Sequence, residues 1–220
     1  MSPGKFVTFE GGEGVGKTTL ISHLKNAAAI SDLSVHFTRE PGGSPRAEAL
    51  RNVLLSAADA IAPMCTETEA LIICAARSDH VDQNIRPRLD AGGHVFCDRY
   101  SDSTRAYQGG LIANDKLESL LSLAERGTVP DLTFLLDASP EQMLQRREKR
   151  EQSRDRFEAR DLDFHTKVRE RFLSIAEQNG DRIIVVDADQ PENDVLRIVL
   201  EALEERLGIC LTSPTGSDPC

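Results

Sequence analysis

The chain has 220 residues, of which 40% are hydrophobic, so it can bury one substantial core without dividing into two domains. Its formal net charge of −10 argues against a general nucleic-acid binder, which would present a basic face, and no apolar stretch approaches the roughly eighteen residues of a membrane span. A first strand expected from about residue 5 leaves no room for a signal peptide. Five scattered cysteines without a C-x-x-C pair favour reduced thiols and a cytoplasmic protein.

The first expected elements are a β-strand at residues 5–9, a glycine-rich loop and a helix with apolar residues at helical spacing. Residues 11–19 read GGEGVGKTT and fit the P-loop pattern G-x-x-x-x-G-K-[ST]. A strand, a glycine turn and a helix in this order direct backbone N–H groups and the positive helix end at a phosphate chain. Lys17 is expected near the β- and γ-phosphates, and Thr18 offers a hydroxyl to Mg²⁺. The alternative is an accidental glycine turn, against which the flanking strand and helix weigh.

The expected phosphate-binding residues are Gly11, Gly12, Glu13, Gly14, Val15, Gly16, Lys17, Thr18 and Thr19.

Strands and helices alternate along the rest of the chain. Short apolar runs predict strands at residues 34–38, 95–98, 132–137 and 183–187. Thr66 and Glu69 form a capping-box pattern that predicts the start of a long helix ending near residue 91. Other helices are expected through residues 51–55, around 101–108 and 115–125, and from about 191 to 207. Continuous apolar strands alternating with helices predict an α/β fold with a parallel sheet covered on both faces.

The predicted organisation is a single domain over residues 1–208, with a mobile lid at about 146–160 and a disordered tail at 209–220. Ligands of such sheets bind outside the carboxyl ends of the strands. The P-loop, Asp98, Asp137 and Asp187 should therefore lie along one edge of the sheet. Asp98 is the best candidate for Mg²⁺, because an arginine and polar residues follow it, whereas Asp137 and Asp187 fit turn or cap positions better.

Several arginines suggest a second anion beside the nucleotide. Arg51, Arg77 and Arg99 each lie in or next to a predicted apolar element. For any one of them the alternative is a solvated arginine whose stem covers apolar surface. The segment 146–156 is dense in charge, and its alternative is a solvated helix face laced with ion pairs.

The chain resembles the thymidylate kinases of the bacterial type from Phe6 to about Leu203. Five ordered segments carry the resemblance, namely residues 9–19, 38–43, 98–109, 130–132 and 155–158. The resemblance implies a P-loop kinase fold with a five-stranded parallel sheet, helices on both faces and a homodimer. It also implies transfer of the γ-phosphoryl group of ATP to dTMP with Mg²⁺ as cofactor, which gives dTDP and ADP.

The resemblance also implies roles for individual residues at the phosphates. Residues 14–19 cradle the ATP phosphates, with Lys17 catalytic. Glu13 faces the 3′-hydroxyl of dTMP. Arg51 and Arg99 hold the acceptor phosphate, with Asp98 beside them and the metal.

At the base, the resemblance implies that Arg77 and Gln108 read the thymine edge and that Tyr107 crowds the 2′ position. The family commonly has an aromatic residue four places before the base-reading arginine, where this chain has Ile73. We expect Ile73 to form an aliphatic wall of the base pocket. The alternative is that Ile73 points into the core.

Residues 12–15 of the P-loop include no basic residue, so the catalytic arginine is expected from the lid. The resemblance gives this role to Arg156, and the other lid arginines are Arg146, Arg150 and Arg154.

Two other functions stay open at this point. The first is a kinase for a different nucleoside monophosphate, because the aromatic residue is absent at Ile73. The second is a non-enzymatic P-loop switch such as a GTPase. Residues 90–93 match D-x-x-G by letter but do not end an apolar strand, and there is no N-K-x-D for guanine.

Overall fold

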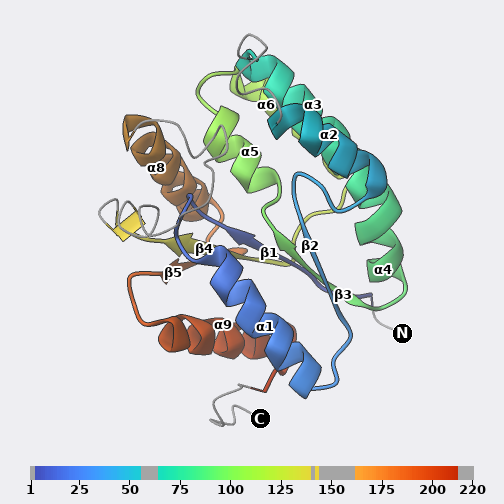
Figure 1. The fold of residues 1–220 in the computed structure, drawn as a ribbon, viewed down its shortest axis with the longest axis vertical. Helices are drawn as coiled ribbons and strands as arrows, with labels where there is room; N and C mark the ends of the chain where they lie inside the picture. Colours follow the sequence, from blue (N-terminus) through green and yellow to red (C-terminus); the bar gives the residue numbers. More distant parts are fainter. Residues whose placement is uncertain (1–2, 56–63, 140–141, 144–161, 213–220) are drawn as a thin grey trace.

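Five parallel strands form a single sheet in the computed structural model, which describes residues 3–55, 64–139, 142–143 and 162–212 (Figure 1). The strands are β1 (Phe6–Glu10), β2 (Val35–Arg39), β3 (His94–Asp98), β4 (Leu132–Asp137) and β5 (Ile183–Asp187). Their order across the sheet is β2-β3-β1-β4-β5, and every strand pair is parallel. The predicted α/β architecture is confirmed.

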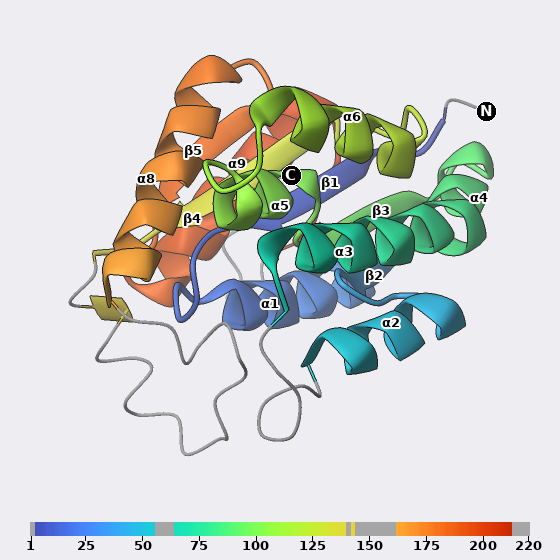
Figure 2. The ribbon, with the colours of Figure 1, turned by 90° about the horizontal axis from the view of Figure 1, so that it is seen from above.

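Helices cover both faces of this sheet (Figures 1 and 2). One face carries α1 (Lys17–Ile30) and α9 (Glu192–Leu207). Against the other face lie α3 (Thr66–His80), α5 (Ser101–Gln108) and α8 (Leu162–Gln178). Two further helices, α2 (Pro45–Leu55) and α6 (Asn114–Glu125), pack against α3. A π-helical turn, η1 (Val81–Ile85), and the short helix α4 (Arg86–Asp90) continue α3.

The alternation of side chains along β1 explains this layering. Val7 and Phe9 are fully buried in the core that includes α1 and α9, whereas Phe6 packs edge-on against Tyr100 on the opposite face. Each such buried apolar side chain contributes about 1.5–3 kcal/mol through removal from water. Thr8 is also fully buried, and its hydroxyl lies 2.7 Å from that of Thr133, so both polar groups are satisfied.

The carboxyl ends of the strands meet at one edge, as predicted. Phe9 is in register with Asp98, and Asp137 with Asp187. Asp187 is a turn residue, because its Oδ1 accepts the N–H of Asp189. Asp137 instead accepts two hydrogen bonds from Arg169, at 2.6 and 2.7 Å, which fasten α8 to the end of β4.

The predicted capping box at the start of α3 is wrong. The helix begins at Thr66 with Cys65 as its N-cap, and no side chain caps it. Glu69, which would complete the box, is 2% exposed and turns inward to Gln108. The burial of Glu69 reflects tertiary packing, which a local pattern does not reveal.

Two expectations about the C-terminal region also need correction. The tail predicted at 209–220 starts too early, because Ile209 and Leu211 are buried in the core against α1 and α9. Residues 213–220 lie outside the described part of the chain. Cys65, Cys74 and Cys97 are free thiols as expected, whereas Cys210 is disulfide-bonded.

No helix in the described part is long and apolar enough to cross a membrane.

Candidate functional site

The loop between β1 and α1 needs glycine for its backbone geometry. Gly11 has φ +136°, and a Cβ there would lie 2.4 Å from the carbonyl oxygen of Leu136. Gly14 and Gly16 also have positive φ, and Gly16 is the N-cap of α1. The N-terminus of a 14-residue helix therefore opens at the end of the loop, with its first N–H groups available to an anion.

The side chain of Lys17 folds toward the P-loop and contacts its backbone. Its Nζ donates to the carbonyl oxygens of Gly11, at 3.0 Å, and Gly12, at 2.8 Å. Burial lowers the pKa of Lys17 to about 8, and the charge of Arg99 adds to this effect. A buried ammonium of this kind gains stability from a polyanion, so the loop is electrostatically prepared for phosphate.

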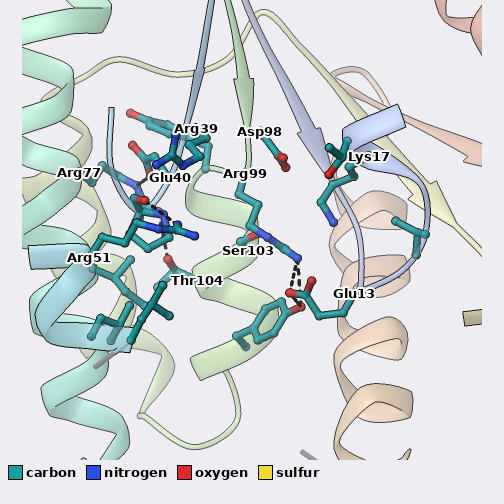
Figure 3. A pocket seen from close by; sticks show the side chains of 18 of the residues that line it. Glu13, Lys17, Arg39, Glu40, Arg51, Arg77, Asp98, Arg99, Ser103 and Thr104 are labelled. Atoms are coloured by element: carbon teal, nitrogen blue, oxygen red, sulfur yellow. Dashed lines mark hydrogen bonds and ion pairs between the residues drawn. The ribbon is translucent and has the colours of Figure 1, made fainter. Parts of the chain in front are cut away.

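Beside Lys17 lies a cavity of about 260 Å³ that brings most of the predicted site residues together. The P-loop, the turn after β2, α2, α3, the end of β3 and α5 line it (Figure 3). The predicted residues on its wall are Glu13, Gly14, Val15, Gly16, Lys17, Thr18, Arg51, Ile73, Arg77, Asp98, Arg99, Tyr107 and Gln108. Gly11 and Gly12 lie behind Lys17, and Thr19 lines a neighbouring cavity. The four predicted lid arginines, Arg146, Arg150, Arg154 and Arg156, lie outside the described residues.

Arg99 occupies the middle of this cavity, between the P-loop and α5 (Figure 3). It has φ +69°, and its guanidinium donates to Gly11 O at 3.0 Å, Ser103 Oγ at 3.0 Å and Glu13 Oε1 at 2.6 Å. Burial would raise the pKa of Glu13, but the charges of Arg99 and Lys17 and a hydrogen bond from Tyr107 lower it to about 2. Glu13 is therefore ionised at neutral pH and holds Arg99 in place.

Arg51 reaches the same cavity from α2, with its Nη1 donating to the carbonyl oxygen of Pro41 at 2.9 Å. Arg39, which sequence analysis did not single out, also lines the cavity and pairs with Glu48. Arg39 and Arg51 lie on the same side of the cavity as Arg77, across from Lys17, with Arg99 between them (Figure 3). Cationic side chains therefore line both sides of the cavity.

The part of the cavity beside Arg77 and Gln108 holds two unsatisfied polar atoms. Arg77 is 1% exposed, donates from Nε to Glu40 Oε2 at 2.7 Å and from Nη2 to Thr104 Oγ1 at 3.1 Å. Its Nη1 and the Oε1 of Gln108 are buried without a hydrogen-bond partner among the described residues. An unsatisfied buried polar atom costs about 1–3 kcal/mol, so one donor and one acceptor here favour a polar ligand.

Ile73 also lines the cavity and is 8% exposed, so it is mostly buried. Its expected role as a wall of the base pocket stays a prediction. Glu40 and Thr104 were not assigned roles from the sequence, because nothing local in it shows that they would hold Arg77.

Asp98 and Thr18 fit a magnesium ion. Both line the cavity, and Asp98 Oδ1 is buried without a partner among the described residues. The described residues contain no cluster of three acidic, histidine or cysteine ligands. Mg²⁺ needs no such cluster, because it is usually held by one or two carboxylates together with substrate phosphates and water.

A second cavity of about 280 Å³ lies on the other side of the P-loop. Thr19, Leu20 and His23 of α1 line it together with Gln190 and Val195 near the start of α9. The P-loop thus separates two cavities, so a ligand with a phosphate chain can reach both.

The chain is similar in sequence to known thymidylate kinases. The family model described as thymidylate kinase matches residues 9–199. The thymidylate kinase of Caulobacter vibrioides is 44% identical over 214 residues, covering 95% of this chain and all of the relative. Those of Chromohalobacter salexigens and Magnetococcus marinus are 43% and 42% identical and cover 94% and 92% of this chain, with 98% and 97% of the relatives covered.

Sequence analysis did not include Glu10 in the predicted site. Its position as the last residue of β1, at the carboxyl edge of the sheet, was the signal that could have identified it. Its Oε1 accepts the N–H groups of Tyr100, at 2.8 Å, and Ser103, at 3.3 Å, and its Oε2 accepts the Ser103 hydroxyl at 2.5 Å. The side chain of Tyr100, the N-cap residue of α5, does not cap that helix. Glu10 caps the helix instead and fixes the backbone that follows Arg99.

Replacing Glu10 by Gln should change how stability depends on pH. Burial and the charge of Asp102 raise the pKa of Glu10 from 4.5 to about 7, so between these values the folded state binds the proton more tightly than the unfolded chain. The free energy of unfolding of the wild type therefore falls as pH rises through this window, by about 1–3 kcal/mol. Glu10→Gln should lack that fall, because the amide accepts the same N–H groups without titrating. Urea unfolding at pH 5 and pH 8 measures this, with Glu205→Gln on the exposed side of α9 as control. Equal pH dependence in wild type and Glu10→Gln would contradict the assignment.

Proposed function

The chain belongs to the thymidylate kinase family, and we propose that its cavity transfers the γ-phosphoryl group of ATP to dTMP, giving dTDP and ADP. One observation carries the proposal. The family match spans a P-loop that opens onto a cavity lined by arginines, with an unsatisfied donor on Arg77 and an unsatisfied acceptor on Gln108. Such a cavity suits a nucleotide whose phosphate faces the P-loop and whose base lies beside Arg77 and Gln108.

The phosphate of dTMP is the nucleophile in this reaction. A phosphate monoester has a second pKa of about 6, so its oxygen is largely anionic at neutral pH and needs no general base. The barrier is the mutual repulsion of two polyanions and the alignment of attacking and leaving oxygens. Lys17, Arg51 and Arg99 counter the repulsion from fixed, largely buried positions, where charges act more strongly than in water.

The sugar of dTMP would lie against Glu13 and Tyr107. Their side chains contact each other, with Tyr107 Oη donating to Glu13 Oε1 at 3.1 Å. In this arrangement Glu13 accepts a hydrogen bond from the 3′-hydroxyl, and the ring of Tyr107 leaves little room for a 2′-hydroxyl. Arg99 lies over the Tyr107 ring and would bind the adjacent phosphate.

Thr18 and Asp98 would hold Mg²⁺, which neutralises charge on the phosphates of ATP when bound. The P-loop supplies no arginine of its own, so Arg156 and the other lid arginines would close over the transferring group. The nucleoside of ATP would occupy the second cavity, beside Thr19 and His23.

Two copies of the chain would form the working enzyme. Helices α2, α3 and α6 form one layer (Figure 1). In this layer the apolar side chains Val53, Leu71 and Leu123 are 52%, 56% and 75% accessible. Covering them with the same layer of a second copy would bury apolar surface in a two-fold interface. The requirement for ATP and dTMP agrees with a cytoplasmic location.

Turnover with a panel of nucleoside monophosphates tests the reaction. ADP release should depend on the acceptor and be fastest with dTMP, whereas a P-loop switch would show no acceptor dependence. Lys17→Ala should lower kcat by about 10²–10³, because Lys17 stabilises developing charge, without unfolding the protein. The exposed Lys25→Ala on the same helix is the matched control. Wild-type turnover in Lys17→Ala would rule out the P-loop assignment.

Ile73→Phe should tighten dTMP binding. An aromatic ring on this wall would add stacking, worth about 1–3 kcal/mol per base in other systems, and the gain should be smaller here because the cavity must make room. ATP binding should not change. Calorimetry with each nucleotide measures both effects. Weaker dTMP binding together with a lowered Tm would mean that Ile73 serves the core and that the base lies elsewhere.

Leu71→Asp should convert the protein from two copies to one at micromolar concentration, because a charge at the centre of an apolar interface is buried without a partner. Sedimentation equilibrium of wild type and variant measures the mass directly. Ile30→Asp is the control, since Ile30 is 55% exposed on α1, away from the proposed interface. A wild type with the mass of one copy would contradict the dimer.

A further inference from the structure

The part of the cavity beside Arg77 and Gln108 can distinguish bases only if the Gln108 amide has a fixed orientation. A side-chain amide carries a donor on one side and an acceptor on the other, so rotation by half a turn reverses what it offers a ligand. Arg77, by contrast, offers only donors. Its Nε and Nη2 are already bound to Glu40 and Thr104, which leaves Nη1 for the ligand.

Glu69 of α3 contacts the Gln108 side chain. It is 2% exposed and is not among the residues that line the cavity. Gln108 Nε2 donates to Glu69 Oε2 at 3.5 Å. This is a long hydrogen bond, but the reversed amide would set two acceptor oxygens at the same distance inside the protein, where repulsion is poorly screened. The carboxylate therefore holds the NH₂ group toward itself and leaves Gln108 Oε1 to face a ligand.

We propose that Glu69 is a specificity-determining positioning residue, which fixes the Gln108 amide so that the cavity offers an acceptor at Gln108 Oε1 and a donor at Arg77 Nη1. This inference rests on the proposed function, in which dTMP is the acceptor. Thymine presents an N3–H donor beside a C4 carbonyl acceptor and complements this pair. Cytosine presents the reverse, an acceptor at N3 beside an amino group.

Selection of thymine over cytosine therefore depends on preventing the Gln108 amide from rotating by half a turn. If Gln108 could turn freely, it would present Nε2 to N3 of cytosine and lose half of its discrimination. Turning costs the hydrogen bond to Glu69 and sets oxygen against oxygen. Glu69 thus acts against the wrong base through Gln108, without touching either base.

Glu69→Gln is the decisive variant, because a neutral amide at position 69 can pair with either orientation of Gln108. The probe is 5-methyl-dCMP, which keeps the methyl group of dTMP and reverses only the hydrogen-bonding edge. In Glu69→Gln the inhibition constant of 5-methyl-dCMP against dTMP should fall about tenfold, the low end for one hydrogen bond to a charged group. KM for dTMP should rise about twofold, and kcat should not change, because the phosphate end of the cavity is untouched.

Glu67→Gln is the matched control, since it removes an exposed carboxylate from the same first turn of α3 and changes the helix end equally. In a Gln108→Ala background, Glu69→Gln should no longer alter the ratio of the two constants, which a merely structural role would not predict. Glu69→Asp, which draws the carboxylate back by about 1.5 Å, should give a smaller fall and serves if Glu69→Gln does not fold.

The outcomes separate the two levels of the proposal. A wild type that does not phosphorylate dTMP would overturn the proposed function. A wild type active on dTMP, with a ratio of the two constants unchanged by Glu69→Gln or Glu69→Asp, would overturn only the role of Glu69. A ratio that falls equally with and without Gln108 would also overturn it, since Glu69 would then act by another route.

Discussion

The site depends on one partly buried ion pair, between Arg99 and Glu13. Through it the P-loop and α5, which belong to separate parts of the chain, are held at a fixed distance. Arg99 also donates to Gly11 O and Ser103 Oγ, so its guanidinium joins the backbone of the loop to the helix. Removing either charge would leave the other partly buried without this partner, which is more costly than the net contribution of the pair itself.

Buried or partly buried carboxylates recur throughout this site, and each fixes a different group. Glu13 holds the guanidinium of Arg99, Glu40 holds that of Arg77, and Glu10 caps the N-terminus of α5. None of these three carboxylates is more than partly exposed. The arginines that would bind polyanions are thereby held in place by neighbouring carboxylates. The binding groups are preorganised before a ligand arrives.

Sequence reasoning predicted the fold and the chemistry of the site because both leave local signals. Continuous apolar strands predicted the parallel sheet, the glycine spacing predicted the loop, and the strand-ending Asp98-Arg99 pair predicted the carboxyl edge. The supporting carboxylates were missed because their partners are distant in sequence. Glu10 meets Tyr100, Glu40 meets Arg77, and Glu69 was misread as a capping residue because its local pattern is that of a helix start. The lid arginines lie outside the described residues and stay predictions.

The low pKa of Lys17, which burial and the charge of Arg99 cause, links nucleotide binding to the uptake of a proton. With a pKa of about 8 in the free protein, this lysine is partly deprotonated in mildly alkaline solution. Bound phosphates favour the ammonium, so a nucleotide that binds above pH 8 must draw a proton from the buffer. Affinity then declines as pH rises, and the measured heat of binding varies with the ionisation enthalpy of the buffer. The burial of Lys17 beside Arg99 thus couples phosphate binding at this loop to proton uptake.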